Sequence, residues 1–90
     1  MYRIVSVTPH PDLSLRLTFA DGHVKRVNIR PFIKGALSQP LAAWDFFQQV
    51  TIDSAGGLAW PNGYDICPNF LRDDVEDMDV AAQPTPLQTA

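Results

Sequence analysis

The stretch SLRLTFADGHVKRVNI, residues 14–29, decides the fold because it reads as two β-strands joined by a tight turn. In its first half, apolar residues alternate with polar ones, which is typical of a strand with one face buried and the other in water. The apolar set, with the residue just before the stretch, is Leu13, Leu15, Leu17 and Phe19. Asp21-Gly22 between apolar strands is a strong hairpin signal, because both central residues of such a turn need a positive φ. The stretch therefore predicts an antiparallel hairpin.

The segment on the N-terminal side of this hairpin, YRIVSV at residues 2–7, favours an extended chain through its β-branched residues. Between it and the hairpin lies Thr8-Pro9-His10-Pro11-Asp12, whose two prolines we expect to end the strand and force a loop. Together the three extended segments predict an antiparallel meander with one apolar face.

The chain after the meander has helical signals. Pro31 ends the third strand, and PFIKG, residues 31–35, predicts one helical turn. Then SQPLAAWDFFQQV, residues 38–50, predicts a short helix with a cap from Ser38 or Gln39. The large apolar residues of this helix, which we expect to pack on the sheet as part of the core, are Leu41, Trp44, Phe46 and Phe47.

The last third of the chain returns to short extended segments. VTID and LAW predict two further short strands around the turn residues Ser54 to Gly57. Pro61-Asn62-Gly63 predicts a tight turn, after which the chain runs extended into a last helical turn that begins at Pro68. The predicted fold class is therefore α+β: a three-stranded antiparallel meander, a short helix packed on it, two more short strands and a C-terminal helical turn.

The chain changes character after this helical turn. DDVEDMD, residues 73–79, holds five acidic residues, and the segment that follows has no charge and two prolines. Such segments cannot bury enough apolar surface to offset the entropy lost on ordering. We therefore assign residues 1–75 to a single α+β domain and residues 76–90 to an acidic, proline-containing disordered tail.

The composition is that of one small domain in a reducing compartment. Ninety residues with 46% hydrophobic side chains suffice for a single modest core. One cysteine cannot form an internal disulfide, and the first residues lack the apolar run of a signal peptide. No apolar run approaches the roughly 20 residues that span a bilayer. We therefore expect a soluble, cytoplasmic protein.

Charge is distributed unevenly along the chain. Residues 1–36 hold six basic and two acidic residues, whereas residues 37–90 hold one basic and eight acidic residues. The two halves either neutralise each other by packing together or present a basic surface to a nucleic acid. The predicted helix has no lysine or arginine and cannot be a basic recognition helix. The nucleic-acid alternative therefore depends on Arg3, Arg16 and Arg26 sharing an exposed sheet face.

Motifs for catalysis, cofactors or metals are absent from the sequence. Cys67 as a nucleophile needs a neighbouring base, and both histidines, His10 and His23, fall in predicted loops away from it, so we expect a buried, inert thiol. Asp65 is expected to accept backbone N–H bonds or to cap the turn at Pro68. No phosphate-binding or dinucleotide-binding glycine motif occurs, and no metal-ligand cluster is predicted. We therefore expect no cofactor and no metal.

Two stretches together resemble a known bacterial family. L-x-L-x-F-x-D-G in the first half, and W-P-N-G-x-D-I-x-P-x-x-L in the second, resemble the family called domain of unknown function twenty-four forty-two over residues 3–72. The residues that carry the resemblance are Leu15, Leu17, Phe19, Asp21, Gly22, Phe47, Val50, Trp60, Pro61, Asn62, Gly63, Asp65, Pro68 and Leu71.

The resemblance implies a small α+β domain with an antiparallel sheet and no known enzyme activity. Some relatives carry a helix-turn-helix module after this domain, but here only about 19 residues follow Leu71, which puts DNA binding in doubt. Other relatives are single domains that are often encoded beside a second small protein, in pairs suspected to be toxin–antitoxin systems. This context is an analogy, and the sequence itself does not show a neighbour.

Three functional hypotheses follow. The first is a non-catalytic protein-interaction module, the accessory or antitoxin-like member of a pair, which binds through a sheet edge and through Trp60, Asn62, Tyr64 and Asp65. The second is a nucleic-acid-associated regulator that uses the arginine face. The third is an enzyme centred on the loop from Trp60 to Cys67. Edge strands and oppositely charged halves also favour a homo-oligomer, and no membrane partner is expected.

Overall fold

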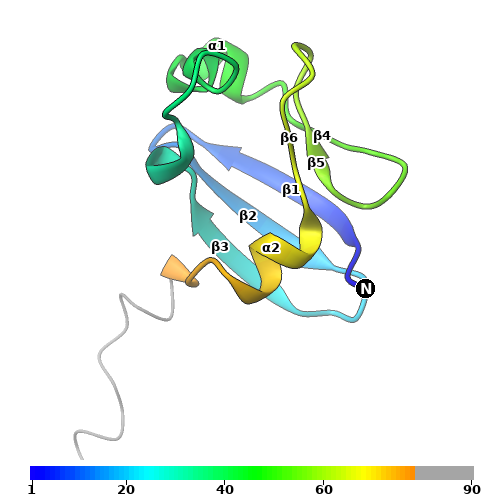
Figure 1. Ribbon diagram of the computed structural model, residues 1–90. Coiled ribbons are helices and arrows are strands. Elements are labelled where there is room, and N and C mark those ends of the chain that lie inside the picture. Colours follow the sequence, from blue (N-terminus) through cyan, green and yellow to red (C-terminus); the bar gives the residue numbers. More distant parts are fainter. Residues whose placement is uncertain (79–90) are drawn as a thin grey trace, which may run out of the picture.

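Two small antiparallel sheets form the framework of the protein, and the computed structural model in Figure 1 describes its residues 1–78. The first sheet has the order β1-β2-β3, with β1 at Ile4–His10, β2 at Ser14–Phe19 and β3 at Val24–Asn28. The second has the order β4-β5-β6, with β4 at Thr51–Ile52, β5 at Leu58–Ala59 and β6 at Asp65–Ile66. The helical segments are η1 at Arg30–Phe32, η2 at Gln39–Ala42, α1 at Trp44–Phe47 and α2 at Pro68–Asp73.

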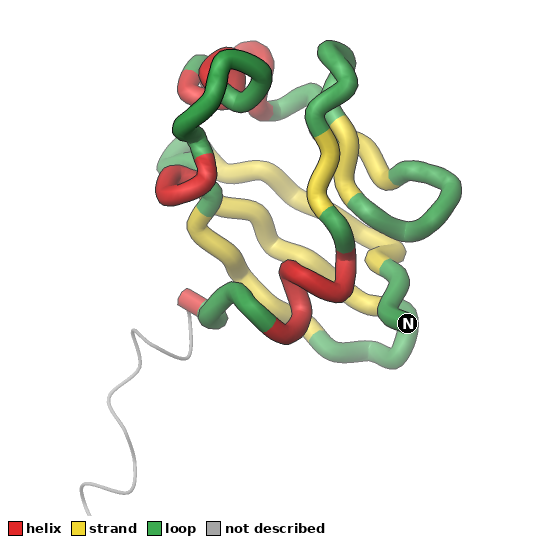
Figure 2. Tube along the Cα trace, in the orientation of Figure 1, coloured by secondary structure: helices red, strands yellow, loops and turns green. Residues whose placement is uncertain are grey.

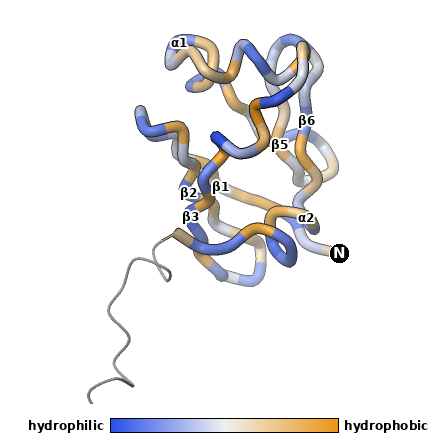
Figure 3. The backbone as a smooth tube through the Cα atoms, turned by 60° about the vertical axis from the view of Figure 1, so that its left-hand side comes forward, coloured by the Kyte–Doolittle hydropathy of each residue, from blue (hydrophilic) through white to orange (hydrophobic). Residues whose placement is uncertain are grey.

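The predicted α+β class and the three-stranded meander are confirmed, and the second sheet has one strand more than the sequence predicted. The inner face of the meander forms most of the core, which β6, α2 and α1 help to cover, as Figure 2 shows. Figure 3 shows hydrophobic stretches on the strands and on α2, separated by hydrophilic turns. The buried apolar residues are Ile4, Leu15, Leu17, Phe19, Val27, Ile29, Leu41, Phe47, Leu58, Trp60, Ile66 and Leu71.

The loop predicted at residues 8–12 is shorter than expected, because β1 continues through Pro9 to His10. The amide of Arg26 donates outside the sheet, to Asp77 Oδ1, so Arg26 and the residue opposite it on β2 form a non-hydrogen-bonded pair. Since such pairs alternate along antiparallel strands, the amide position of Pro9 points away from β2. A proline there removes no ladder bond, which is why an edge strand accommodates it.

All four hairpins of the described chain turn in the same way. In each, the amide of the fourth residue donates to the carbonyl of the first, at 2.9–3.0 Å, and the fourth residue has a positive φ. The fourth residues are Leu13, Gly22, Gly56 and Gly63, with φ of 66°, 92°, 82° and 93°. This is a type I turn followed by a left-handed residue, a common hairpin connection. The prediction that Asp21 and Gly22 would both have positive φ is therefore wrong for Asp21.

A side chain supports each of these turns. The carboxylates of Asp12 and Asp21 and the amide oxygen of Asn62 each accept the backbone N–H two residues later, at 3.1–3.2 Å. In the hairpin between β4 and β5, Asp53 Oδ1 accepts the amides of Ala55 and Gly57, both at 2.9 Å. Asp and Asn favour such turns because their short side chains bond to nearby backbone amides.

Gly56 joins the two sheets as well as completing a turn. Its carbonyl accepts the amide of Ile4 at 2.8 Å. A Cβ on Gly56 would lie 2.9 Å from the backbone Cα of Arg3, which is closer than real Cβ atoms approach. Only glycine therefore permits the start of β1 to lie against this hairpin.

We predict that Gly56→Ala destabilises the fold more than Gly63→Ala. Both changes place a Cβ on a left-handed residue, which costs about 1–2 kcal/mol. Gly63 has open space around it, so it serves as the matched control for the clash of Gly56 with Arg3. Urea denaturation of both variants measures the difference. Equal losses would show that the contact between the sheets is not tight.

The single helix predicted over residues 38–50 is wrong. Ala43 is extended, with φ −92° and ψ 127°, and separates η2 from α1. Leu41 and Phe47 are six positions apart and would lie about 120° apart on one continuous helix. The break allows both side chains to be fully buried. Ser38 does not cap a helix, because its hydroxyl accepts the amides of Lys34 and Gly35.

Lys25 holds α2 against the sheet. The strand pattern places Lys25 on the inner face, where it is only 6% exposed, and its ammonium donates to the carbonyls of Leu71 and Arg72 at 2.7 and 2.8 Å. These carbonyls lie in the last turn of α2, which has no intrahelical donors for them. Burial lowers the pKa of Lys25 from its ordinary value, against the opposing effect of Asp77.

We predict that Lys25→Met lowers the free energy of unfolding by about 2–3 kcal/mol, because two buried carbonyls lose a charged donor. Lys34→Met, at an exposed position, is the matched control and is expected to leave stability unchanged. Chemical denaturation followed by tryptophan fluorescence compares the two variants. A Lys25→Met protein as stable as the control would show that the ammonium does not hold α2 in place.

Candidate functional site

A groove of about 390 Å³ lies between the chain that follows β3 and the segment that runs from β6 into α2. It is open along its length. The residues that line it include Phe32, Lys34, Tyr64, Asp65, Cys67 and Phe70. We call this feature the η1–β6 groove. Its walls come from residues about 30 positions apart in the sequence, which α2 brings together by packing on the sheet.

Aromatic rings form the apolar part of the η1–β6 groove. Phe32 and Phe70 meet edge to face, with centroids 5.4 Å apart and an interplanar angle of 79°. Tyr64 packs on Trp60 with centroids 5.7 Å apart. All three groove rings are half-buried, so they are held by the core and still offer an exposed surface. Such rings are rigid and lose little entropy when a ligand binds.

Two opposite charges line the groove together with these rings. Lys34 and Asp65 are both exposed, and within residues 1–78 neither side chain makes a hydrogen bond or an ion pair. They do not form a salt bridge with each other, although both line the groove. The charges are therefore available to a ligand that carries the complementary groups.

The residues predicted for partner binding divide into two pairs. Trp60 is only 3% exposed and donates its indole N–H to the carbonyl of Phe47 at 3.0 Å, so it belongs to the core. Asn62 donates to the carbonyl of Leu37 at 2.8 Å and supports a turn. Tyr64 and Asp65 both line the η1–β6 groove. Of the four residues predicted for partner binding, two therefore line the groove, and the sequence pattern did not distinguish the buried Trp60 from the residues at the surface.

The prediction of a buried Cys67 is wrong, because the thiol is exposed. Cys67 is the N-cap residue of α2 and directly follows the buried Ile66. Successive side chains of an extended chain point to opposite sides, so the side chain of Cys67 points away from the core. Neither histidine lines the groove, so Cys67 has no imidazole base there. Asp65 does not cap α2 either, since no side chain bonds to the first turn of that helix.

Sequence reasoning missed Phe32, Lys34 and Phe70. Phe32 and Lys34 lie in the PFIKG segment, which carries no motif, and the sequence gives no sign that it approaches α2. A signal for Phe70 was present, because PNFL repeats apolar residues in the last helical turn. One of these apolar residues, Leu71, is fully buried, while Phe70 is only half-buried.

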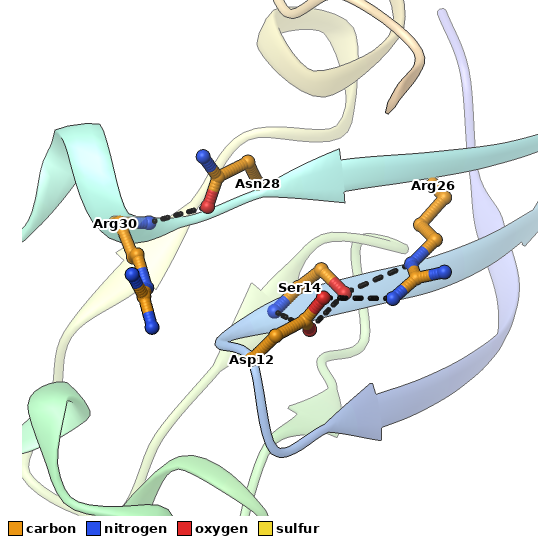
Figure 4. Close-up of polar contacts among 5 residues, drawn as sticks. All are labelled: Asp12, Ser14, Arg26, Asn28 and Arg30. Carbon is orange, nitrogen blue, oxygen red and sulfur yellow. Dashed lines mark hydrogen bonds and ion pairs between the residues drawn. The ribbon is translucent and has the colours of Figure 1, made fainter. Parts of the chain in front are cut away.

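The proposed arginine face is only partly assembled. Arg16 and Arg26 lie opposite each other on β2 and β3. Figure 4 shows that the guanidinium of Arg26 donates to Ser14 Oγ and to Asp12 Oδ2, at 2.9 and 2.8 Å. Arg3 lies beyond a bulge in β1 and donates to the carbonyl of Ser54 at 3.3 Å. Two of the three arginines are thus engaged by acceptors within the chain.

We predict that Asp12→Asn reduces the loss of stability in acid. The Ser14 hydroxyl bond lowers the pKa of Asp12 from its ordinary 3.8, with a smaller contribution from Arg26. A carboxylate with a lowered folded pKa stabilises the fold above its unfolded pKa, and this contribution disappears as the pH falls through the folded value. Asp12→Asn should therefore lower stability at pH 7 and flatten the decline below about pH 4.

Urea midpoints measured at neutral and acid pH test this prediction, with Asp45→Asn on α1 as the control. Asp45 is exposed, and its side chain makes no hydrogen bond within the described chain. An unchanged pH profile in Asp12→Asn would show that the bond with Ser14 is not formed in solution.

The described part of the chain contains neither a metal-binding cluster nor a membrane-spanning helix. Among residues 1–78, no group of three histidine, cysteine or acidic side chains is placed to hold a metal ion. No helix in that part of the chain has the length and apolar character needed to cross a lipid bilayer.

Comparison with known proteins gives a family but no activity. A family model described as "Protein of unknown function (DUF2442)" matches residues 4–77. No curated protein and no solved structure matches the chain significantly. The match spans both sheets and α2, so it covers every element that builds the η1–β6 groove. The chain belongs to the family of proteins of unknown function DUF2442.

Proposed function

We propose that the protein is a non-catalytic protein-interaction module that binds an extended peptide segment of a partner protein in the η1–β6 groove. The observation that carries this proposal is the pair of opposite charges, Lys34 and Asp65, which line the same groove as the aromatic rings and make no hydrogen bond or ion pair within residues 1–78. The family resemblance adds the expectation that the chain is the accessory or antitoxin-like member of a two-protein pair.

The groove defines the chemistry of its occupant. The rings of Phe32, Tyr64 and Phe70 favour an apolar or aromatic side chain as the central anchor. Lys34 favours an acidic residue on one side of this anchor, and Asp65 favours a basic residue on the other. The open form of the groove suits an extended chain better than a small molecule, which usually needs an enclosed pocket.

The two alternative functions have weaker support. An enzyme centred on Cys67 requires a base to form the thiolate, and neither histidine lines the groove. A nucleic-acid ligand would bring phosphates to Arg16 and Arg26, beside the carboxylate of Asp12 that Arg26 already binds. The enzyme hypothesis predicts an activity that Cys67→Ser abolishes. The nucleic-acid hypothesis predicts an affinity for nucleic acid that falls steeply with salt concentration.

Capped pentapeptides with a central phenylalanine test the proposal. One peptide carries glutamate before and lysine after the phenylalanine, and the other has the reverse order. We expect the protein to prefer one order, with shifts of amide resonances at residues 64–67. The variants Lys34→Glu and Asp65→Lys should each weaken this peptide about two- to fivefold, as expected for exposed ion pairs.

The double variant, Lys34→Glu with Asp65→Lys, provides the decisive comparison. It should prefer the peptide of opposite order, because both charges of the groove have been exchanged. Asp45→Lys changes an exposed carboxylate outside the groove and is the matched control. If neither peptide perturbs residues 64–67, or if the double variant keeps the original preference, the groove does not select peptides by these charges.

A further inference from the structure

The groove side of β6 is an edge of the second sheet. β5 pairs with the other side of β6, and neither β4 nor β5 contributes a residue to the η1–β6 groove. The segment 64–67 does line the groove, with Phe32 and Lys34 across from it. β4, at the opposite edge of the sheet, lies beside β1 instead. The edge of β6 therefore runs along the groove that the proposed peptide occupies.

The alternation of bonds along β6 shows which backbone groups this edge offers. The amide of Trp60 donates to the carbonyl of Tyr64 at 2.9 Å, so these two residues form a hydrogen-bonded pair. The next pair, Ala59 and Asp65, is then a non-hydrogen-bonded one, and Asp65 directs both its N–H and its C=O away from β5. Cys67, two residues further on and also extended, directs its N–H the same way.

The rest of the described chain does not satisfy these groups. Within residues 1–78, no loop, turn or side-chain acceptor receives the N–H of Asp65 or of Cys67, and no donor outside the second sheet reaches the C=O of Asp65. The carbonyl of Cys67 differs, because it accepts the amide of Leu71 at 3.2 Å. The edge thus offers an N–H, a C=O and a second N–H, which are the groups that an added strand uses.

The side chains of this edge divide between the two faces of the sheet. Ile66 is buried, whereas Asp65 and Cys67 are exposed. The rings of Phe32 and Phe70 pack against the core, on the side of Ile66. Successive side chains of a strand placed beside β6 alternate in the same way. An apolar side chain opposite Ile66 therefore meets the two rings, and its two neighbours lie on the exposed face.

We propose that the partner peptide binds as a fourth strand of the second sheet, antiparallel to β6. One peptide residue lies opposite Asp65 and exchanges two backbone bonds with it. The apolar anchor precedes this residue and lies opposite Ile66, and the residue before the anchor accepts the N–H of Cys67. This inference rests on the proposed peptide binding and adds the backbone contacts that hold the peptide. Both existing pairings of the sheet are antiparallel, and antiparallel pairing is the more stable per residue.

This register determines the order of charges that the groove prefers. The peptide residue opposite Asp65 lies on the same face as its carboxylate, and cross-strand pairs of opposite charge are stabilising. A basic residue is therefore favoured directly after the anchor, and Lys34 favours the acidic residue before it. A parallel strand would instead place the residue before the anchor opposite Asp65. The pentapeptide with glutamate before and lysine after the phenylalanine should thus bind more tightly than the reverse one.

Ester forms of this pentapeptide test the proposal, because an ester oxygen removes one N–H without adding bulk. An ester in place of the lysine amide removes the donor to the carbonyl of Asp65 and should weaken binding about fivefold to tenfold. An ester in place of the phenylalanine amide is the matched control, since this N–H points away from β6 in the antiparallel register. It should weaken binding clearly less. Titrations of the full chain, followed by the amide resonances of residues 64–67, give the affinities.

The expected result is a weakened lysine ester, together with slower exchange of the Asp65 and Cys67 amides when the unmodified peptide saturates the protein. If the unmodified peptide binds at residues 64–67 and both esters bind equally well, peptide binding stands and the strand pairing is overturned. A greater loss from the phenylalanine ester, or a preference for the reverse order of charges, shows a parallel strand and also overturns it. If no peptide binds, the proposed function fails and this inference fails with it.

Discussion

The bond from the buried ammonium of Lys25 to the end of α2 is the interaction on which the rest of the structure depends. The Lys25 ammonium is a charge in the core, and the core tolerates it because it donates to the backbone carbonyls of Leu71 and Arg72. Two further contacts hold α2 against Tyr2. Asn69 Oδ1 accepts the amide of Tyr2 at 2.9 Å, and the guanidinium of Arg72 lies 4.3 Å from the centroid of the Tyr2 ring. These contacts fix α2 on the sheet, and so they place the wall of the η1–β6 groove.

The second constraint is the repeated turn. The three strands of the second sheet have two residues each and little stability of their own, so the geometry of this sheet depends on the hairpin turns that join them. An acidic or amide side chain supports each turn, and glycine occupies the left-handed position in three of the four. Leu13 is the exception, with φ 66°. Its side chain packs against the core, which offsets the cost of that conformation.

The sequence predicted what depends on local pattern. Alternation in β2 and the Asp21-Gly22 turn predicted the meander, and Pro61-Asn62-Gly63 predicted the turn between β5 and β6 but not the pairing of β6. The errors have a common cause, which is tertiary contact. Pro9 remains in a strand because β1 is at an edge, and Ala43 breaks the predicted helix because the core buries residues on both sides of it. Cys67 is exposed, contrary to the prediction, because it lies where α2 begins, and Lys25 is buried because α2 covers it.

The candidate site was only half visible in the sequence for the same reason. Tyr64 and Asp65 could be recognised in the sequence by their unusual neighbours, whereas Lys34 and Phe32 come to line the groove only when the chain folds.

We propose that this groove holds the apolar side chain of a partner peptide. The most direct measurement is a set of intermolecular NOEs between the preferred peptide and the protein. We predict contacts from the peptide phenylalanine to the rings of Phe32 and Phe70, and contacts confined to β1 or to the arginine face would contradict the account.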